Sequence, residues 1–156
     1  MALILVTNDD GFFSKGIQIL AESLKEIGEV YIVAPDRDRS AVSHALTMHR
    51  PLKVELIREC CYSVNGTPTD CVVVGVKKLL PREPNIIVSG INKGANLGED
   101  VTYSGTVSAA IEGTILGVPS IAISLVGERP FKYETASHFA VTLVKFILEK
   151  GLPLAT

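Results

Sequence analysis

Residues 2–11 read ALILVTNDDG, an apolar run that stops at two adjacent carboxylates and a glycine. Because the run is continuously apolar rather than alternating, it predicts a strand over Ala2–Thr7 that is buried on both faces, as strands of parallel sheets are. Three similar runs predict three more buried strands, at Val30–Ala34, Asn85–Ser89 and Ser120–Leu125. A sheet made of such strands has to be covered by helices on both sides.

The segments between these runs carry helical signals. Apolar residues recur at helical spacing over residues 17–27 and 136–147, as on the buried face of a helix. Residues 67–70 (TPTD) resemble a capping box with proline at the first helical position, which predicts a helix start there. Another helix is expected to begin at residues 104–106 (SGT) and to end at Gly117.

Two further runs, 52–57 and 60–64, indicate an extra strand or hairpin inserted in this alternation. The resulting order favours an α/β fold with a mostly parallel sheet and helices on both faces. Neither an internal repeat nor a linker divides the sequence, so we expect a single domain over residues 1–156. In an open parallel sheet, ligands bind beyond the carboxyl ends of the strands, so the chemistry is expected there.

Composition narrows the possible functions. The 156 residues are 47% hydrophobic and 21% charged with a formal net charge of −2, which fits one globular domain and argues against disorder. The small negative net charge does not indicate the excess of Lys and Arg that binding to long nucleic acid requires. The charge-free stretch Gly113–Gly127 is too short and too interrupted to cross a membrane, and Ala2–Val6 does not resemble a secretory signal. Three cysteines without a C-x-x-C pattern fit neither a disulfide framework nor a zinc site, so a reducing cytoplasm is expected.

Polar residues follow each of the first two predicted strands. Asp9 and Asp10 come directly after the first strand, and paired carboxylates suit a hard divalent cation such as Mg²⁺ or Mn²⁺. The alternative is an Asx-turn and helix cap. The second strand leads into the charged loop 34–40 (APDRDRS), where Ser40 can add a hydroxyl ligand. Alternatively this loop is simply solvated, and His44 beyond it is incidental.

The strongest local signal follows the third buried strand. Residues 89–98 (SGINKGANLG) carry three glycines at intervals of four, which predicts a loop whose backbone approaches a ligand closely. The segment matches neither the P-loop nor the dinucleotide-binding pattern. Residues 103–108 (YSGTVS) then open a helix, whose free N–H groups and hydroxyls suit an anion, although a plain serine cap explains them equally well. Together these features indicate a carboxylate-bound metal facing a phosphate cradle.

Five motifs resemble those of a known family, the stationary-phase survival protein SurE family of metal-dependent nucleotidases and acid phosphatases. They occur in the family's order, over essentially the whole chain: Asn8-Asp9-Asp10-Gly11, Ala34-Pro35-Asp36-Arg37 with Ser40, Gly66-Thr67-Pro68-Thr69-Asp70-Cys71, Ser89-Gly90-Ile91-Asn92 with Asn96-Leu97-Gly98, and Tyr103-Ser104-Gly105-Thr106-Val107.

The resemblance implies a Rossmann-like, three-layer αβα fold and one divalent metal ion, Mg²⁺ or Mn²⁺. It implies that this ion is held by Asp9, Asp10, Ser40 and Asn92, and that Asn96, Ser104, Gly105 and Thr106 hold phosphate. The implied reaction releases phosphate from nucleoside monophosphates, and in some members from short polyphosphate. Asp9 and Asp10 are the candidate catalytic residues, because either can orient the attacking water or act as its base.

The resemblance also bears on assembly. Family members form homodimers or homotetramers and are longer than this chain, so we expect the family's C-terminal oligomerisation segment to be absent and a further strand to begin where the sequence stops, at residues 151–156. A chain of this length is expected to expose the sheet edge or helix face that such a segment covers, and to be poorly soluble or differently assembled.

Two other classes of function stay open at this point. A phosphorylation-dependent receiver module also opens with an acidic pair, but it needs an acceptor aspartate after its third strand and a lysine after its fifth, which 52–57 and 120–125 do not supply. The other alternative is a catalytically incomplete domain that binds metal or nucleotide.

Overall fold

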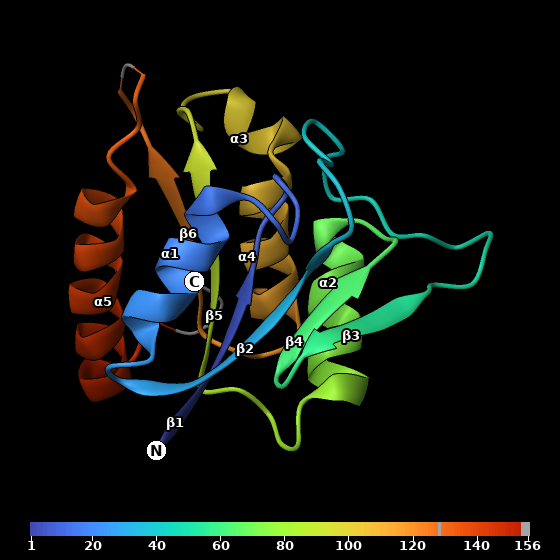
Figure 1. Ribbon diagram of the computed structural model, residues 1–156, viewed down its shortest axis with the longest axis horizontal. Coiled ribbons are helices and arrows are strands. Elements are labelled where there is room, and N and C mark those ends of the chain that lie inside the picture. Colours follow the sequence, from blue (N-terminus) through green and yellow to red (C-terminus); the bar gives the residue numbers. More distant parts are fainter. Residues whose placement is uncertain (128, 154–156) are drawn as a thin grey trace.

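The protein forms a six-stranded sheet between two layers of helices, in a computed structural model that describes residues 1–127 and 129–153 (Figure 1). The strand order is β3-β4-β2-β1-β5-β6, and every neighbouring pair is parallel except β3 and β4. The strands are β1 (Ala2–Thr7), β2 (Gly28–Pro35), β3 (Val54–Arg58), β4 (Cys61–Val64), β5 (Ile86–Lys93) and β6 (Ser120–Leu125). This arrangement confirms the predicted α/β class with a mostly parallel sheet.

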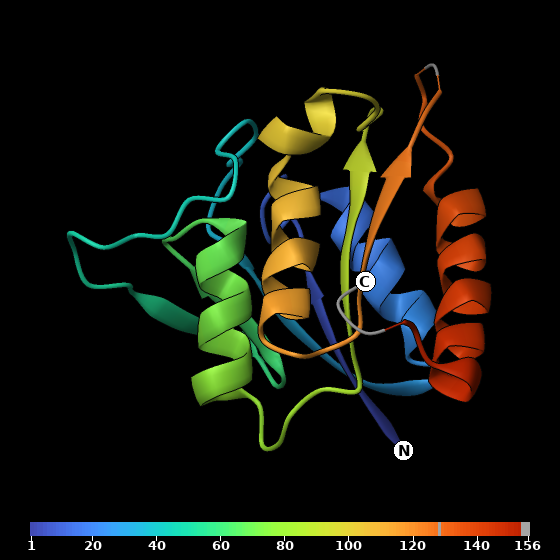
Figure 2. The same cartoon turned by 180° about the vertical axis from the view of Figure 1, so that it is seen from behind.

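Helices cover both faces of the sheet. On one face lie α1 (Lys15–Leu24) and α5 (Tyr133–Lys150). On the other lie α2 (Pro68–Val74), which continues as the π-helical turn η1 (Gly75–Leu79), and α4 (Gly105–Ile115), as Figure 2 shows. The short helix α3 (Asp100–Tyr103) sits above α4 at the upper end of the molecule. The result is three layers, helix, sheet and helix.

Strand β1 supplies the core on both sides of the sheet. Its residues Leu3 to Thr7 are all 0% exposed. Ile4 and Val6 pack with α1 and α5, whereas Leu5 belongs to the cluster under α2 and α4. This two-sided burial is the reason why the run is continuously apolar.

Several predicted element boundaries are confirmed. Strands β1 and β6 occupy the predicted ranges, and the hairpin of β3 and β4 is present. Helix α2 begins with the predicted capping box between Thr67 and Asp70, and α4 begins after its N-cap Ser104. Cys60 is an exception, because it adopts φ 59° in the hairpin turn and lies outside β4.

Two boundaries were predicted wrongly. The periodicity over 17–27 overextends α1, which ends at Leu24 and is followed by a turn in which the Ile27 N–H donates to Leu24 O. The predicted loop after Ser89 is still strand, because β5 runs on to Lys93 and pairs with β6 across a register shift between Ser89 and Asn92. Residues 154–156, which belong to the segment where a further strand was expected to begin, lie outside the described residues.

The β6 side of the sheet is open. Within residues 1–127 and 129–153, strand β6 pairs with β5 alone and forms an edge of the sheet. On the neighbouring helix α5, Phe139 and Phe146 are 61% and 57% exposed. An apolar cavity of about 420 Å³ lies between β6 and the first turns of α5, lined by residues 122–125 of β6 and by Thr135, Ala136 and Phe139 of α5. Among the helices of the described residues, none is both long enough and apolar enough to cross a bilayer.

Helix α4 lies so close to the sheet that a glycine is required at the contact. A Cβ added at Gly113 would overlap Ser120 Oγ and come within 2.7 Å of Ile87 Cδ1. We therefore expect Gly113→Ala to lower the free energy of unfolding by about 1–3 kcal/mol, because overpacking outweighs the gain of about 1 kcal/mol in helix propensity. Urea denaturation measures the change. Ile115→Ala, at a 66% exposed position of the same helix, is the control, and a Gly113→Ala chain of unchanged stability would contradict the close packing.

Candidate metal and phosphate site

The carboxyl ends of β1, β2 and β5 lie at the same edge of the sheet, at the top of Figure 1. The turn after β1 is organised by Asn8, whose Nδ2 donates to Gly11 O at 3.0 Å and to Ser14 Oγ at 2.8 Å. Asn8 thus accounts for the turn, while no side chain caps the first turn of α1 and no acidic residue lies in it. Asp9 and Asp10 are therefore not used as helix caps.

Asp9 is a buried carboxylate that faces α4. It is 4% exposed, and its Oδ1 accepts a 2.6 Å hydrogen bond from Thr106 Oγ1. Burial raises the pKa of Asp9, the charge of Asp10 raises it further, and the hydrogen bond from Thr106 acts in the opposite direction. A buried carboxylate beside a second one is costly to ionise unless a cation compensates its charge.

Asp10 meets a cation from β5. Its side chain is 3% exposed, and Asp10 Oδ1 lies 3.3 Å from Lys93 Nζ. The charge of Asp10 is the main cause that raises the pKa of Lys93, so the ammonium stays charged. Tyr133 lies nearby, where burial raises the pKa of the phenol and the charge of Asp10 raises it further. Sequence reasoning missed Lys93, although it directly follows Asn92 in the glycine-rich motif.

The start of α4 is packed directly against Asp9. Ser104 Oγ caps the helix by accepting from the Val107 N–H at 3.2 Å. A Cβ at Gly105 would come within 2.8 Å of Asp9 Cβ and 3.1 Å of Asp9 Oδ2, so only glycine allows this approach. Among the predicted phosphate-binding residues, Gly105 and Thr106 are therefore adjacent to Asp9, and Ser104 directly precedes them. The positive end of an eleven-residue helix lies beside Asp9.

The loop after β2 reaches the same place through its backbone. The Arg39 N–H donates to Asp9 O at 2.7 Å, which fixes the neighbouring Ser40 at this edge. The exposed Ser40 side chain donates to Asp38 Oδ1 at 2.6 Å, and this hydrogen bond is the main cause that lowers the pKa of Asp38. Ser40 Oγ is thus close in the chain to Asp9 but engaged with Asp38.

The two amides of the glycine-rich motif have different partners. Asn92 lies in β5, half-buried, and its Nδ2 donates to Gly94 O at 3.1 Å. Asn96 Nδ2 donates to Ser124 Oγ at 2.6 Å, which ties the loop to β6. A close approach was expected between this backbone and a ligand. The structure shows a close approach at Gly90 (φ 143°), where a Cβ would come within 2.5 Å of Ile123 O. The close approach is therefore to β6.

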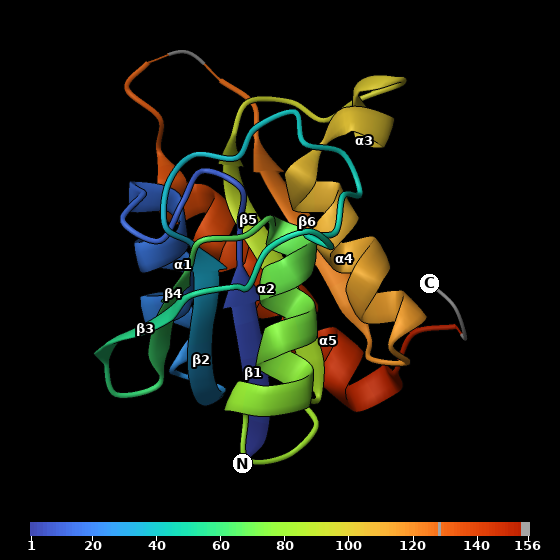
Figure 3. The ribbon, with the colours of Figure 1, turned by 90° about the vertical axis from the view of Figure 1, so that its right-hand side faces the viewer.

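Residues 36–53 form a long connection that crosses the upper end of the molecule, seen in cyan in Figure 3. Polar contacts hold it to both helices beneath. His44 Nε2 lies 2.7 Å from Glu112 Oε2 on α4, and Thr47 donates through its N–H and its hydroxyl to Asp70 on α2. His44 thus has a structural contact with α4, and nothing in this contact indicates that it acts as a base. No local pattern reveals these pairs, because their partners are 68 and 23 residues away.

The donor set at this edge fits a hard divalent cation. Residues 1–127 and 129–153 contain no group of three or more His, Cys, Asp or Glu side chains that could hold a metal ion. An ion here would depend on Asp9 and Asp10 plus neutral oxygens, which is the ligand type that Mg²⁺ and Mn²⁺ accept. Asn8 Oδ1 is also buried without a hydrogen-bond partner in this turn.

Comparison with known proteins shows the family to which the chain is similar. The family described as survival protein SurE matches residues 4–156. A "5'-nucleotidase SurE" of Geobacter metallireducens is 56% identical over 151 residues, covering 96% of this chain and 60% of the relative. One of Geotalea daltonii is 54% identical over 154 residues, covering 98% and 62%. The crystal structure of the SurE protein from Aquifex aeolicus superposes with a TM-score of 0.93 at 50% identity, covering 97% of this chain and 62% of that one.

The chain thus spans about 60% of the length of the curated relatives it matches. The match runs through all five motifs and through every strand of the sheet. On this basis the chain belongs to the SurE family.

Proposed function

We propose that this chain carries the active site of a metal-dependent nucleotidase that releases phosphate from nucleoside monophosphates. The observation that carries the proposal is the pair of adjacent carboxylates at the end of β1. Asp9 is 4% exposed and accepts from Thr106 at the N-terminus of α4, and the side chain of Asp10 is 3% exposed beside Lys93. Relatives at 54–56% identity are named 5'-nucleotidase SurE, which supports the same reaction. Short polyphosphate is a further substrate that the family resemblance implies.

The proposed metal ligands are Asp9, Asp10, Ser40 and Asn92. When bound, a divalent cation supplies positive charge opposite the phosphoryl oxygens and makes water more acidic. Ser40 would have to turn from Asp38, to which it now donates. Which divalent ion serves is open between Mg²⁺ and Mn²⁺, because both accept these oxygen ligands.

The other residues of the site position the phosphate and the water. The N-terminus of α4, at Ser104, Gly105 and Thr106, favours the negative charge of a phosphoryl group. Thr106 holds Asp9 in one orientation through its hydroxyl, so that a carboxylate can orient the water that attacks phosphorus. Asn96 is the remaining proposed phosphate contact. Positioning and charge stabilisation supply most of the catalysis in phosphoryl transfer. The residues of the proposed site would contribute in both ways.

A receiver module finds no support in the structure. In the order of the parallel strands, β4 is the third and ends at Val64-Asn65, and β6 is the fifth and ends at Leu125. The acceptor aspartate and the lysine that such a module needs are absent from these strand ends. A catalytically incomplete domain is tested directly by turnover, as described below.

The first prediction from this proposal concerns the metal. Because burial raises the pKa of Asp9, ionising it costs stability in the metal-free chain as the pH rises above 3.8, and a bound cation offsets that cost. At 100 times its dissociation constant, Mn²⁺ is expected to stabilise the chain by about 2.7 kcal/mol, and by less at pH 5 than at pH 7.5. Asp10→Asn is expected to remove this stabilisation and to lower Mn²⁺-dependent release of phosphate from AMP at least about 100-fold.

Differential scanning calorimetry and a phosphate assay check both outcomes. Glu134→Gln, an exposed carboxylate on α5, is the matched control and should behave as the unmodified chain does. Full metal-dependent turnover in Asp10→Asn would reject the proposed site. Mn²⁺ binding without any turnover in the unmodified chain would favour the incomplete binding domain instead.

The second prediction concerns Thr106. Thr106→Val removes the hydroxyl that donates to Asp9 while keeping the size and shape of the side chain. We expect kcat for AMP to fall about tenfold, which corresponds to about 1.4 kcal/mol of lost positioning. Thr106→Ser keeps the donor and should retain most of the rate. Equal losses in the two variants would show that the methyl group, rather than the hydrogen bond, matters.

We also infer that the chain is located in a reducing cytoplasm and that it self-associates. The three free cysteines support a reducing compartment. Exposed Phe139 and Phe146 beside the open edge of β6 support association between copies of this chain. The family resemblance implies dimers or tetramers for the longer family members. Light scattering after size exclusion should therefore detect a dimer or larger species, and the double variant Phe139→Glu, Phe146→Glu should shift it toward monomer. A monomeric unmodified chain at micromolar concentration would contradict this inference.

A further inference from the structure

Lys93 is a cation held over a buried acid. Its Nζ lies 3.3 Å from Asp10 Oδ1, and the two side chains are exposed to very different extents, 49% for Lys93 and 3% for Asp10. An ion pair between two exposed groups has little energetic meaning. Here the carboxylate side is almost inaccessible to water, so its attraction to Lys93 is screened less than that of a surface pair.

The backbone keeps Lys93 at this position. It is the last residue of β5 and lies opposite Leu125 of β6, beyond the register shift that lengthens the strand. Gly94, with φ 121°, then turns the chain while its N–H donates to Leu125 O at 2.9 Å. The Cα of Lys93 is thus fixed at the carboxyl edge, next to Asn92, while its long side chain remains free to move.

Asp10 cannot serve both the ammonium and a divalent cation equally well. The two positive groups repel each other at short range, and a compact ion binds carboxylate oxygens more closely than an ammonium does. A displaced Lys93 ammonium stays beside the site because β5 fixes its backbone. The anion nearest to it would then be the phosphate group that occupies the site, to which lysine donates as a flexible point charge.

We propose that Lys93 is an exchangeable counter-ion: it neutralises Asp10 in the metal-free chain and contacts the substrate's phosphate group once a divalent cation takes its place at Asp10. This inference rests on the proposed function, since it deepens the account of the same site. It assigns phosphate recognition to Lys93, which is not among the predicted site residues.

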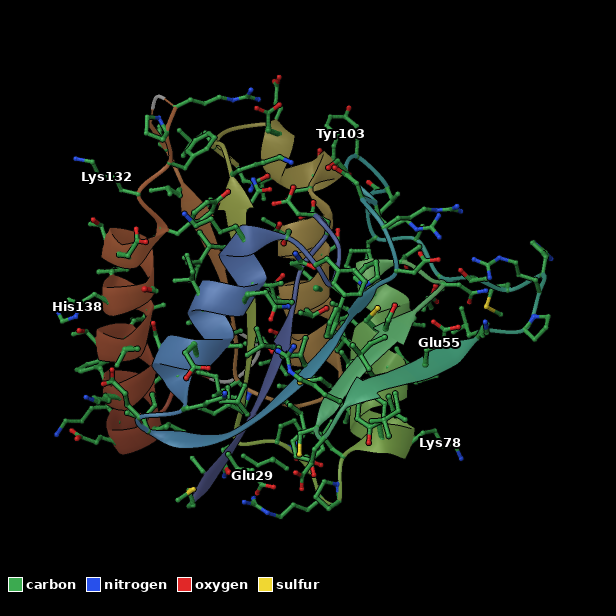
Figure 4. The ribbon with its side chains drawn as sticks, in the orientation of Figure 1. Glu29, Glu55, Lys78, Tyr103, Lys132 and His138 are labelled. Atoms are coloured by element: carbon green, nitrogen blue, oxygen red, sulfur yellow. The ribbon has the colours of Figure 1, made fainter. Side chains whose placement is uncertain are left out.

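The test compares Lys93→Met with Lys78→Met, which removes the same charge at a distant place. Figure 4 shows Lys78 at the lower end of the molecule, far from Tyr103 at the upper end, where the site lies. Binding of Mn²⁺ is followed by electron paramagnetic resonance without substrate, and binding of inorganic phosphate to the Mn²⁺-loaded chain by calorimetry. Lys93→Met is expected to bind Mn²⁺ about three- to tenfold more tightly and phosphate about tenfold more weakly. Lys78→Met should change neither, and Lys93→Arg should restore phosphate binding.

The proposal is overturned if Lys93→Met leaves the Mn²⁺ affinity unchanged or weaker, or if phosphate binds to it as well as to the unmodified chain. Its failure is distinguishable from that of the proposed function. If Asp10→Asn abolishes Mn²⁺ binding while Lys93→Met alters nothing, the metal site stands and the counter-ion role falls. If neither the unmodified chain nor Lys93→Met binds Mn²⁺, both fall.

Discussion

Burial of β1 on both faces is the constraint on which the rest of the structure depends. Its residues are sealed between the two helical layers, so charged groups can enter only where the strand ends. The chain places two there, Asp9 and Asp10. The neighbouring elements then supply what these carboxylates need, a hydroxyl from α4 at Asp9 and an ammonium from β5 at Asp10. The site therefore lies at the end of β1, because a strand covered by helices on both faces can carry charged residues only there.

The negative charges of Asp9 and Asp10 are compensated to different extents, and this difference bears on function. Asp9 is held by hydrogen bonds and has its pKa raised by burial, which leaves room for a cation to stabilise its ionised form. Asp10 already has a positive partner in Lys93. In the proposed site, the carboxylate that would gain most from a metal ion, Asp9, therefore lies next to one that already has a cationic partner, Asp10. Such an arrangement would suit the dianionic phosphate group of the proposed substrate.

The sequence predicted the parts of this protein that depend on local patterns. The apolar runs of β1 and β6 and the capping box at Thr67 each carry their signal within a few residues. The end of β5 could not be predicted, because Gly90 permits a close approach to Ile123 that depends on β6, 30 residues later in the chain. The same limit applied to the site. Its acidic pair was visible as neighbours in sequence, but its pairing with Thr106 and Lys93 exists only through space.

Helix α4 packs so closely against its neighbours that it tolerates few substitutions, whereas the connection 36–53 tolerates many. It touches Asp9 through Gly105 at one end, and Ser120 and Ile87 through Gly113 at the other, so neither end tolerates a larger residue. The connection 36–53, which contacts α4 through His44 and α2 through Thr47, is held by side-chain hydrogen bonds and contributes mostly exposed residues. In the proposed site, natural variation or engineering that changes which leaving group is accepted would therefore accumulate in this connection, while α4 would keep the place of the phosphate constant.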